Sequence, residues 1–259
     1  MAPSYEMIPL QAEPAQPRVA PRKQILKIAL WLVLGFGALY LVTAGLLFLA
    51  EKGALGERAE RWVYLERTRS QFNRLYSLPD PPFEQGPNDF LVKATSSLPR
   101  GEALVIACGQ GRNAVYLAHE GWNVTAFDIA DKGLEIARRT AQRDGVPLKA
   151  ELASAEEFDY GRNRWSLVVF LYSPIRYDDP DLLRRIKDSI KPGGYVVVEM
   201  PLETRNDPAG RRRHPGELLP GELPALFSGF EIVQFQEAVG VSDFFHDRTL
   251  IGRMLARKP

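Results

Sequence analysis

The feature that most constrains the fold is an alternation of short apolar runs with longer helical patterns after Pro87. Four of the runs have the length and composition of buried strands. These are VIAC (105–108), NVTAF (123–127), LVVFLY (167–172) and YVVVEM (195–200). The stretches between them are typical of helices that end at glycine or at Pro-Gly. They are GRNAVYLAHEG (111–121), DKGLEIARRTAQRDG (131–145) and PDLLRRIKDSIKPGG (180–194). This alternation predicts a doubly wound α/β fold, with a mostly parallel sheet and helices on both of its faces.

The C-terminal part of the chain follows a different pattern. FEIVQFQEAV (230–239) and TLIGRMLARK (249–258) are typical strands, and only a short loop separates them. So short a connection favours antiparallel pairing over another crossover. We therefore expect the sheet to close with an antiparallel strand pair.

The N-terminal part contains an uncharged apolar run from Ile28 to Ala50. As a helix this run would be roughly 35 Å long, which is enough to span a bilayer core. It is longer than the apolar part of a cleaved signal peptide, and a buried core helix of this length is rarely apolar on all sides. We therefore predict one transmembrane helix over residues 25–51.

The other segments follow from this division. Residues 1–24 are rich in proline and poor in large apolar side chains, which predicts a disordered tail. Residues 52–86 are charged with interspersed apolar positions, and the prolines after Leu78 end any helix there. They are interpreted as a juxtamembrane helix and linker, a spacer before the folded domain at 87–259.

Charge and composition exclude several function classes. The chain has 33 basic and 32 acidic residues, so no global field attracts nucleic acid, and we expect no nucleic-acid partner. Its one cysteine, Cys108, excludes an internal disulfide framework. The histidines His119, His214 and His246 are widely spaced, so no metal site is expected.

The run ALVIACGQGRNAVYLA (103–118) predicts a glycine-rich turn between a strand and a helix. Gly109 and Gly111 allow close approach of a ligand to the backbone, and Asn113 is a candidate cap of the helix. Asp128 ends the next strand, where a carboxylate can accept both hydroxyl hydrogens of a ribose. The same spacing also fits a dinucleotide fingerprint or a purely structural turn, so the turn does not choose its ligand.

Several ordered motifs resemble the class I S-adenosylmethionine-dependent methyltransferases, in particular the small tellurite-resistance-type domains. CGQGRNAVYLAHEGWNVTAFD resembles the first and second motifs of that family, and IKPGGYVVVEM resembles its Lys-Pro-Gly-Gly turn and fifth strand. FDYGRNRWSLVVFLY resembles the strand that follows the adenine loop. The resemblance covers about residues 87–258. It implies a seven-stranded sheet and S-adenosylmethionine as the cofactor.

The resemblance also implies where the cofactor binds. Ala107, Gly109 and Gly111 would line the methionine and ribose, while Asp128 would hold the ribose hydroxyls. The adenine would lie against Ile129 and near Ser154, Ala155 and Glu156. The sulfonium would lie beside Leu171 and Tyr172 at the exit of the fourth strand.

Three positions depart from the family pattern. Val105, Ser154 and Ser166 stand where the family often has an acid, although Glu156 is close enough in sequence to substitute for the second. Each charge-assisted hydrogen bond is worth roughly 1.5–3 kcal/mol, so their loss predicts weaker cofactor binding.

Methyl transfer needs a general base only if the acceptor arrives protonated, and no catalytic residue is assigned. Tyr172, His214, Asp243 and His246 are candidates near the expected mouth of the site, although a surface or packing role is the simpler interpretation for each. Arg211, Arg212 and Arg213 form a charged loop that could contact anionic lipid or an acidic acceptor.

These features favour a membrane-anchored methyltransferase that acts on a small or lipid-associated acceptor. Two alternatives are a catalytically weak or inactive methyltransferase-like binding module and, less favoured, an NAD(P)-dependent oxidoreductase. Basic residues before the apolar run, at positions 18, 22, 23 and 27, weakly favour a cytoplasmic N-terminus and an external domain. Because S-adenosylmethionine is made in the cytosol, we instead expect a single-pass membrane protein with its domain facing the cytoplasm.

Overall fold

The computed structural model describes residues 39–48, 54–204 and 216–259. The chain divides into two compact units, 1–61 and 62–259. In the first unit, residues 39–48 and 54–61 are helical. The predicted tail and most of the predicted transmembrane helix lie outside the described residues. Within the ranges that are described, no helix is both long enough and apolar enough to cross a bilayer.

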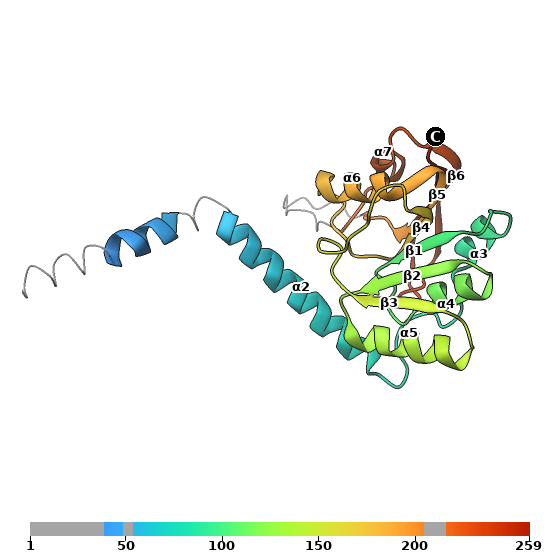
Figure 1. Ribbon diagram of the computed structural model, residues 1–259, viewed down its shortest axis with the longest axis horizontal. Helices are drawn as coiled ribbons and strands as arrows, with labels where there is room; N and C mark the ends of the chain where they lie inside the picture. Colours follow the sequence, from blue (N-terminus) through green and yellow to red (C-terminus); the bar gives the residue numbers. More distant parts are fainter. Residues whose placement is uncertain (1–38, 49–53, 205–215) are drawn as a thin grey trace, which may run out of the picture. The chain divides into compact units, whose positions relative to one another are not determined.

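The second unit is built on a seven-stranded sheet with the order β3-β2-β1-β4-β5-β7-β6 (Figure 1). The strands are β1 (Glu102–Ile106), β2 (Asn123–Asp128), β3 (Leu148–Leu152), β4 (Trp165–Leu171), β5 (Ile190–Pro201), β6 (Glu231–Val241) and β7 (Arg248–Arg257). Strands β1 to β5 pair in parallel, whereas β7 pairs antiparallel with both β5 and β6. The mostly parallel sheet and its closing antiparallel pair confirm the prediction.

Helices cover both faces of this sheet. They are α2 (Ala54–Tyr76), α3 (Asp89–Thr95), α4 (Arg112–His119), α5 (Asp131–Arg143), α6 (Pro180–Ser189) and α7 (Glu222–Leu226). Side chains of α6 belong to one buried cluster, and those of α3 and α4 belong to the other. The predicted arrangement of helices on both faces is therefore confirmed.

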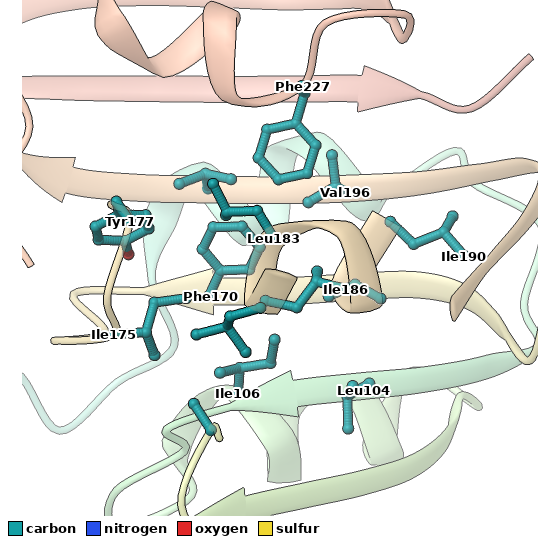
Figure 2. Packing of buried hydrophobic residues seen from close by; sticks show 14 of the residues in the cluster. Leu104, Ile106, Phe170, Ile175, Tyr177, Leu183, Ile186, Ile190, Val196 and Phe227 are labelled. Carbon is teal, nitrogen blue, oxygen red and sulfur yellow. The ribbon is translucent and has the colours of Figure 1, made fainter. Parts of the chain in front are cut away.

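The two clusters explain why the central strands carry unbroken apolar runs. Leu104 and Ile106 of β1 lie in the α6 cluster, together with Phe170 and Val196 (Figure 2). Val105, between them in sequence, lies in the cluster on the other face. Because successive side chains point to opposite faces and both faces are covered, most positions of these strands are apolar.

The structure corrects several local predictions. The edge strand β3 was missed because Lys149 and Glu151 interrupt its short apolar pattern. Strand β1 ends at Ile106 rather than at residue 108, since Ala107 has a positive φ of 50°. Strand β5 begins at Ile190, so it includes the Lys-Pro-Gly-Gly stretch that was expected to end a helix.

Asn113 is not the helix cap that was expected. Helix α4 begins after Gly111, whose φ of 81° places it in the left-handed region, and no side chain caps it. The side chain of Asn113 instead accepts a hydrogen bond from the backbone N–H of Asn88, at 2.9 Å. It therefore joins α4 to the start of α3.

Candidate functional site

The glycine-rich turn follows β1 at the carboxyl edge of the sheet, and Asp128 holds it there. One carboxylate oxygen of Asp128 accepts the N–H of Gly109 at 2.8 Å, and the other accepts the N–H of Ala130 at 2.7 Å. The side chain at the end of β2 thereby fixes the turn that follows β1. This places the turn and the acid together, as the sequence predicts.

Burial raises the pKa of Asp128 to about 6, although hydrogen bonds from the backbone at Ala130, Gly109 and Ile129 oppose the shift. The carboxylate is nevertheless the form that can accept further hydrogen bonds on both oxygens, because each oxygen has two lone pairs. Asp128 therefore fits the role of a ribose ligand.

The two glycines of the turn are required for different reasons. A Cβ at Gly109 would lie 2.3 Å from the hydroxyl oxygen of Tyr76, which packs on the turn from α2. A Cβ at Gly111 would lie 2.4 Å from the Cβ of Ala137 in α5. Gly111 therefore permits close packing of α4 on α5, and it does not line the pocket described next.

A pocket opens at the carboxyl ends of β1, β2 and β4, between the glycine turn and α2. Eight of the ten residues predicted to bind the cofactor line it. They are Ala107, Gly109, Asp128, Ile129, Ala155, Glu156, Leu171 and Tyr172. Ser154 does not line it, and its hydroxyl donates to the carboxylate of Glu157 at 3.3 Å and accepts the Glu157 N–H at 3.2 Å. Contact of these residues with the cofactor stays a prediction.

Helix α2 forms one wall of this pocket, a role that the sequence did not indicate. Tyr64, Phe72 and Tyr76 line the pocket, and the Tyr64 hydroxyl donates to the carbonyl of Pro174 at 3.2 Å. Asn73 fastens the helix to the start of α5: it donates to Asp131 at 2.7 Å and accepts the N–H of Lys132 at 3.0 Å. The second compact unit begins within α2, at Trp62.

Tyr172 leaves β4 with a positive φ of 54°, which is unusual for a residue with a bulky side chain. Its hydroxyl donates to Glu199 at 2.9 Å. Burial raises the pKa of Tyr172, and the negative charge of Glu199 adds to the shift, so the phenol stays neutral. Glu199 itself is only 1% exposed and also accepts from Asn88 at 2.7 Å and from Arg253 at 2.5 Å.

A second ion pair adjoins this network. Asp243 accepts hydrogen bonds from Asn88, at 2.8 Å, and from Arg112. Arg112 also donates to the carbonyl of Gly86 at 2.8 Å. Asn88 therefore connects the Glu199–Arg253 pair to the Asp243–Arg112 pair.

The structure separates the four candidate bases. Tyr172 lines the pocket, whereas Asp243 and His246 do not. Asp243 is engaged with Arg112, and His246 is exposed. His214 and the three neighbouring arginines lie outside the described residues. In the described part of the chain, no cluster of histidine, cysteine and acidic side chains could hold a metal ion.

The departures from the family pattern are not equivalent. Val105 is buried and lines the pocket, so the missing acid there affects the site directly. Ser166 lies at the start of β4, beside Gly101, with its hydroxyl 3.4 Å from the ammonium of Lys191. It does not line the pocket.

Glu199 was also missed, although the sequence carries a signal for it. The residue is an acid inside the apolar strand YVVVEMP, and a buried acid is rare unless it is paired. That pattern indicates a partner, but only the antiparallel register of β5 and β7 brings Arg253 opposite Glu199.

Comparison with known proteins supports the assignment of the domain. Residues 103–194 match a family model described as a methyltransferase domain. Residues 103–194 form a methyltransferase domain, and the chain is similar to class I S-adenosylmethionine-dependent methyltransferases of the TehB type. The cofactor of this domain type is S-adenosylmethionine. The match therefore favours a methyl donor over a dinucleotide as the ligand of the glycine turn.

Two curated relatives align with this domain over about half of their own length. Hemagglutinin 1 of Eikenella corrodens is 26% identical over 61% of this chain and 55% of the relative. A probable S-adenosyl-L-methionine-dependent methyltransferase, TehB of Haemophilus influenzae, is 23% identical over 58% of this chain and 53% of the relative. A ubiquinone biosynthesis O-methyltransferase of Shewanella pealeana is 31% identical over 54% of this chain and 66% of the relative.

Solved structures show the same fold. TehB from Haemophilus influenzae superposes with a TM-score of 0.58 at 20% identity, covering 66% of this chain and 62% of the other. A protein from echinomycin biosynthesis superposes with a TM-score of 0.55 at 19% identity, covering 70% of this chain and 85% of the other.

Proposed function

We propose that this protein transfers a methyl group from S-adenosylmethionine to a small or lipid-associated acceptor, and that a transmembrane helix anchors it. The observation that carries the proposal is the pocket at the carboxyl ends of β1, β2 and β4, where the glycine turn and Asp128 meet. In doubly wound sheets this is the edge at which ligands bind.

The residues of the pocket fit the parts of the cofactor. Asp128 retains lone pairs for the ribose hydroxyls, and Ile129 and Ala155 offer an apolar surface to the adenine. Leu171 and Tyr172 line the pocket at the end of β4, and we expect the reacting methyl group beside them. The bound cofactor supplies the activated methyl group, so the chain's own contribution is to orient the reactants and exclude water.

The lining of the pocket supports a small or lipid-associated acceptor. Most of the lining side chains are apolar or aromatic, and they come from α2 as well as from the strand ends. One relative is named a ubiquinone biosynthesis O-methyltransferase, which is a role of that protein. An acceptor with a large apolar part would gain free energy by leaving water for such a pocket.

Anchoring rests on the uncharged run from Ile28 to Ala50, which precedes α2 by only a few residues. An enzyme that uses a cytosolic methyl donor has to face the cytoplasm. In sealed inverted membrane vesicles, added protease should therefore remove the domain, whereas protease added to intact cells should leave it whole. The opposite pattern, or recovery of the domain in the fraction that does not sediment with membranes, contradicts the proposal.

Methyl transfer itself is tested with a cofactor that carries a labelled methyl group. The full chain is incubated with membrane lipid extract, with small phenols and thiols, and with amines. We expect label in a product of at least one class, and none with an Asp128→Ala variant. Tight cofactor binding without transfer to any class contradicts the proposed activity.

The second candidate function is a catalytically weak or inactive binding module. It is favoured by Val105, which lines the pocket at a position where the family often has an acid. This candidate predicts weak cofactor binding that improves at least about tenfold in Val105→Asp, because a charge-assisted hydrogen bond to the cofactor's amino group is worth roughly 1.5–3 kcal/mol.

A further inference from the structure

Four aromatic side chains form a continuous wall of the pocket, called here the aromatic wall: Phe72, Phe83, Tyr172 and Phe244. Phe244 is its centre. The Phe244 ring stacks on Tyr172, with centroids 5.6 Å apart and planes 19° apart, and it lies 4.7 Å from Phe83 and 6.2 Å from Phe72. The wall therefore joins the exit of β4, where the methyl group belongs, to the surface of α2.

The charges around the wall disfavour an anionic ligand. Among the described residues that line the pocket, Arg112 is the one with a cationic side chain. Its guanidinium is already paired with Asp243 and with the carbonyl of Gly86. Asp128 and Glu156 also line the pocket and carry negative charge when ionised. A neutral ligand avoids this repulsion and leaves the Arg112–Asp243 pair intact.

The wall is held in place before any ligand binds. The segments that carry Phe83 and Phe244 form an antiparallel bridge, with backbone hydrogen bonds from Glu84 to Asp243 at 2.9 Å and from Phe245 to Pro82 at 2.8 Å. Tyr172 is fixed by its hydrogen bond to Glu199. A rigid aromatic surface binds a flat apolar ring with little loss of side-chain freedom.

We propose that the acceptor is a neutral, planar aromatic ring that carries an oxygen or sulfur nucleophile and packs against the aromatic wall. This inference rests on the proposed function and specifies its acceptor. In the reaction the bond between sulfur and methyl breaks, and sulfur keeps the electron pair. A lone pair of the acceptor's oxygen or sulfur forms the new bond to the methyl group, and the acceptor's proton passes to solvent.

Three compounds with the same pair of hydroxyl groups separate the features of the ligand. Catechol is planar and neutral, trans-1,2-cyclohexanediol is neutral but not planar, and 3,4-dihydroxybenzoate is planar but anionic. Binding of each to the full chain is measured by calorimetry with saturating S-adenosylhomocysteine. We expect catechol to bind at least about tenfold more tightly than either of the other two.

Variants of the wall then test where catechol binds. Phe72→Leu and Phe244→Leu should weaken catechol binding about threefold to tenfold, because contact between aromatic rings contributes free energy beyond that of burying apolar surface. The control Phe235→Leu makes the same change on β6, outside the pocket, and should alter nothing. Affinity for S-adenosylhomocysteine, measured in every variant, reports on an intact fold.

The outcomes distinguish the two levels of the proposal. Failure of the unchanged chain to bind S-adenosylhomocysteine overturns the proposed function. Cofactor binding without a preference for catechol, or with equal catechol affinity in Phe72→Leu, Phe244→Leu and the parent chain, overturns only the aromatic acceptor.

Discussion

The affinity for S-adenosylhomocysteine should fall as pH falls through about 6, because Asp128 has to be ionised to accept both ribose hydroxyl hydrogens. Burial raises the pKa of this carboxyl to about 6 in the free protein. At pH 8 nearly all molecules carry the carboxylate, whereas at pH 5 only about one in eleven does. If only the ionised form binds, the dissociation constant rises about tenfold between pH 8 and pH 5.

Calorimetric titrations at half-unit steps from pH 5 to pH 8 measure this dependence. The control is Asp128→Asn, whose binding should be weaker throughout and should lack the step near pH 6. A parent chain whose affinity is constant across this range, or a step that persists in Asp128→Asn, refutes the assigned role of Asp128.

Three further predictions concern stability, each measured as the free energy of unfolding in urea. Because the pKa of Asp128 is raised to about 6 in the folded state, the folded chain binds more protons than the unfolded chain between about pH 4 and pH 6. The free energy of unfolding should therefore fall by about 3 kcal/mol as pH rises through this window. A free energy of unfolding that is constant over this window contradicts the prediction. Gly109→Ala should lower the free energy of unfolding by about 2–4 kcal/mol, and Gly145→Ala by only about 1 kcal/mol. Both glycines have a positive φ, but only at Gly109 would the added Cβ clash with a neighbour, Tyr76. Equal losses in the two variants contradict this prediction. Glu199→Gln should lower the free energy of unfolding by about 3–5 kcal/mol, because it leaves the Arg253 charge without its buried partner. The control Glu135→Gln removes an exposed ion pair with Arg139 and should cost less than about 1 kcal/mol. Similar losses in the two variants contradict this prediction.

The sequence predicted the core of the fold because the central strands are buried on both faces. Such strands are mostly apolar runs, and helices α4 and α5 end two residues before Gly121 and Gly145. The short strand β3 has no such signature, since it lies at the edge of the sheet and is half exposed. Its position is set by pairing with β2, which is a tertiary interaction.

From the residue pattern alone the candidate site could be predicted only at the strand ends, whereas Ala155, Glu156 and Leu171 were predicted from the family resemblance. Gly109 and Asp128 lie at strand ends that the pattern locates, and the parallel sheet brings these ends together. The aromatic residues of α2 have no such marker, because their contacts with the pocket join segments far apart in sequence. Gly111 was predicted to line the cofactor site, but in the structure it allows α4 to pack closely against Ala137 of α5. The motif alone does not distinguish these two roles of a glycine.

Direct calorimetric binding of the methyl donor tests the central claim most directly. S-adenosylmethionine and S-adenosylhomocysteine are titrated into the full chain at pH 8, with NADH and NADPH as the competing dinucleotides. We predict binding of one molecule of either sulfur compound per chain, and its loss in Asp128→Ala. Binding of a dinucleotide instead, or of no ligand by a folded chain, contradicts the account.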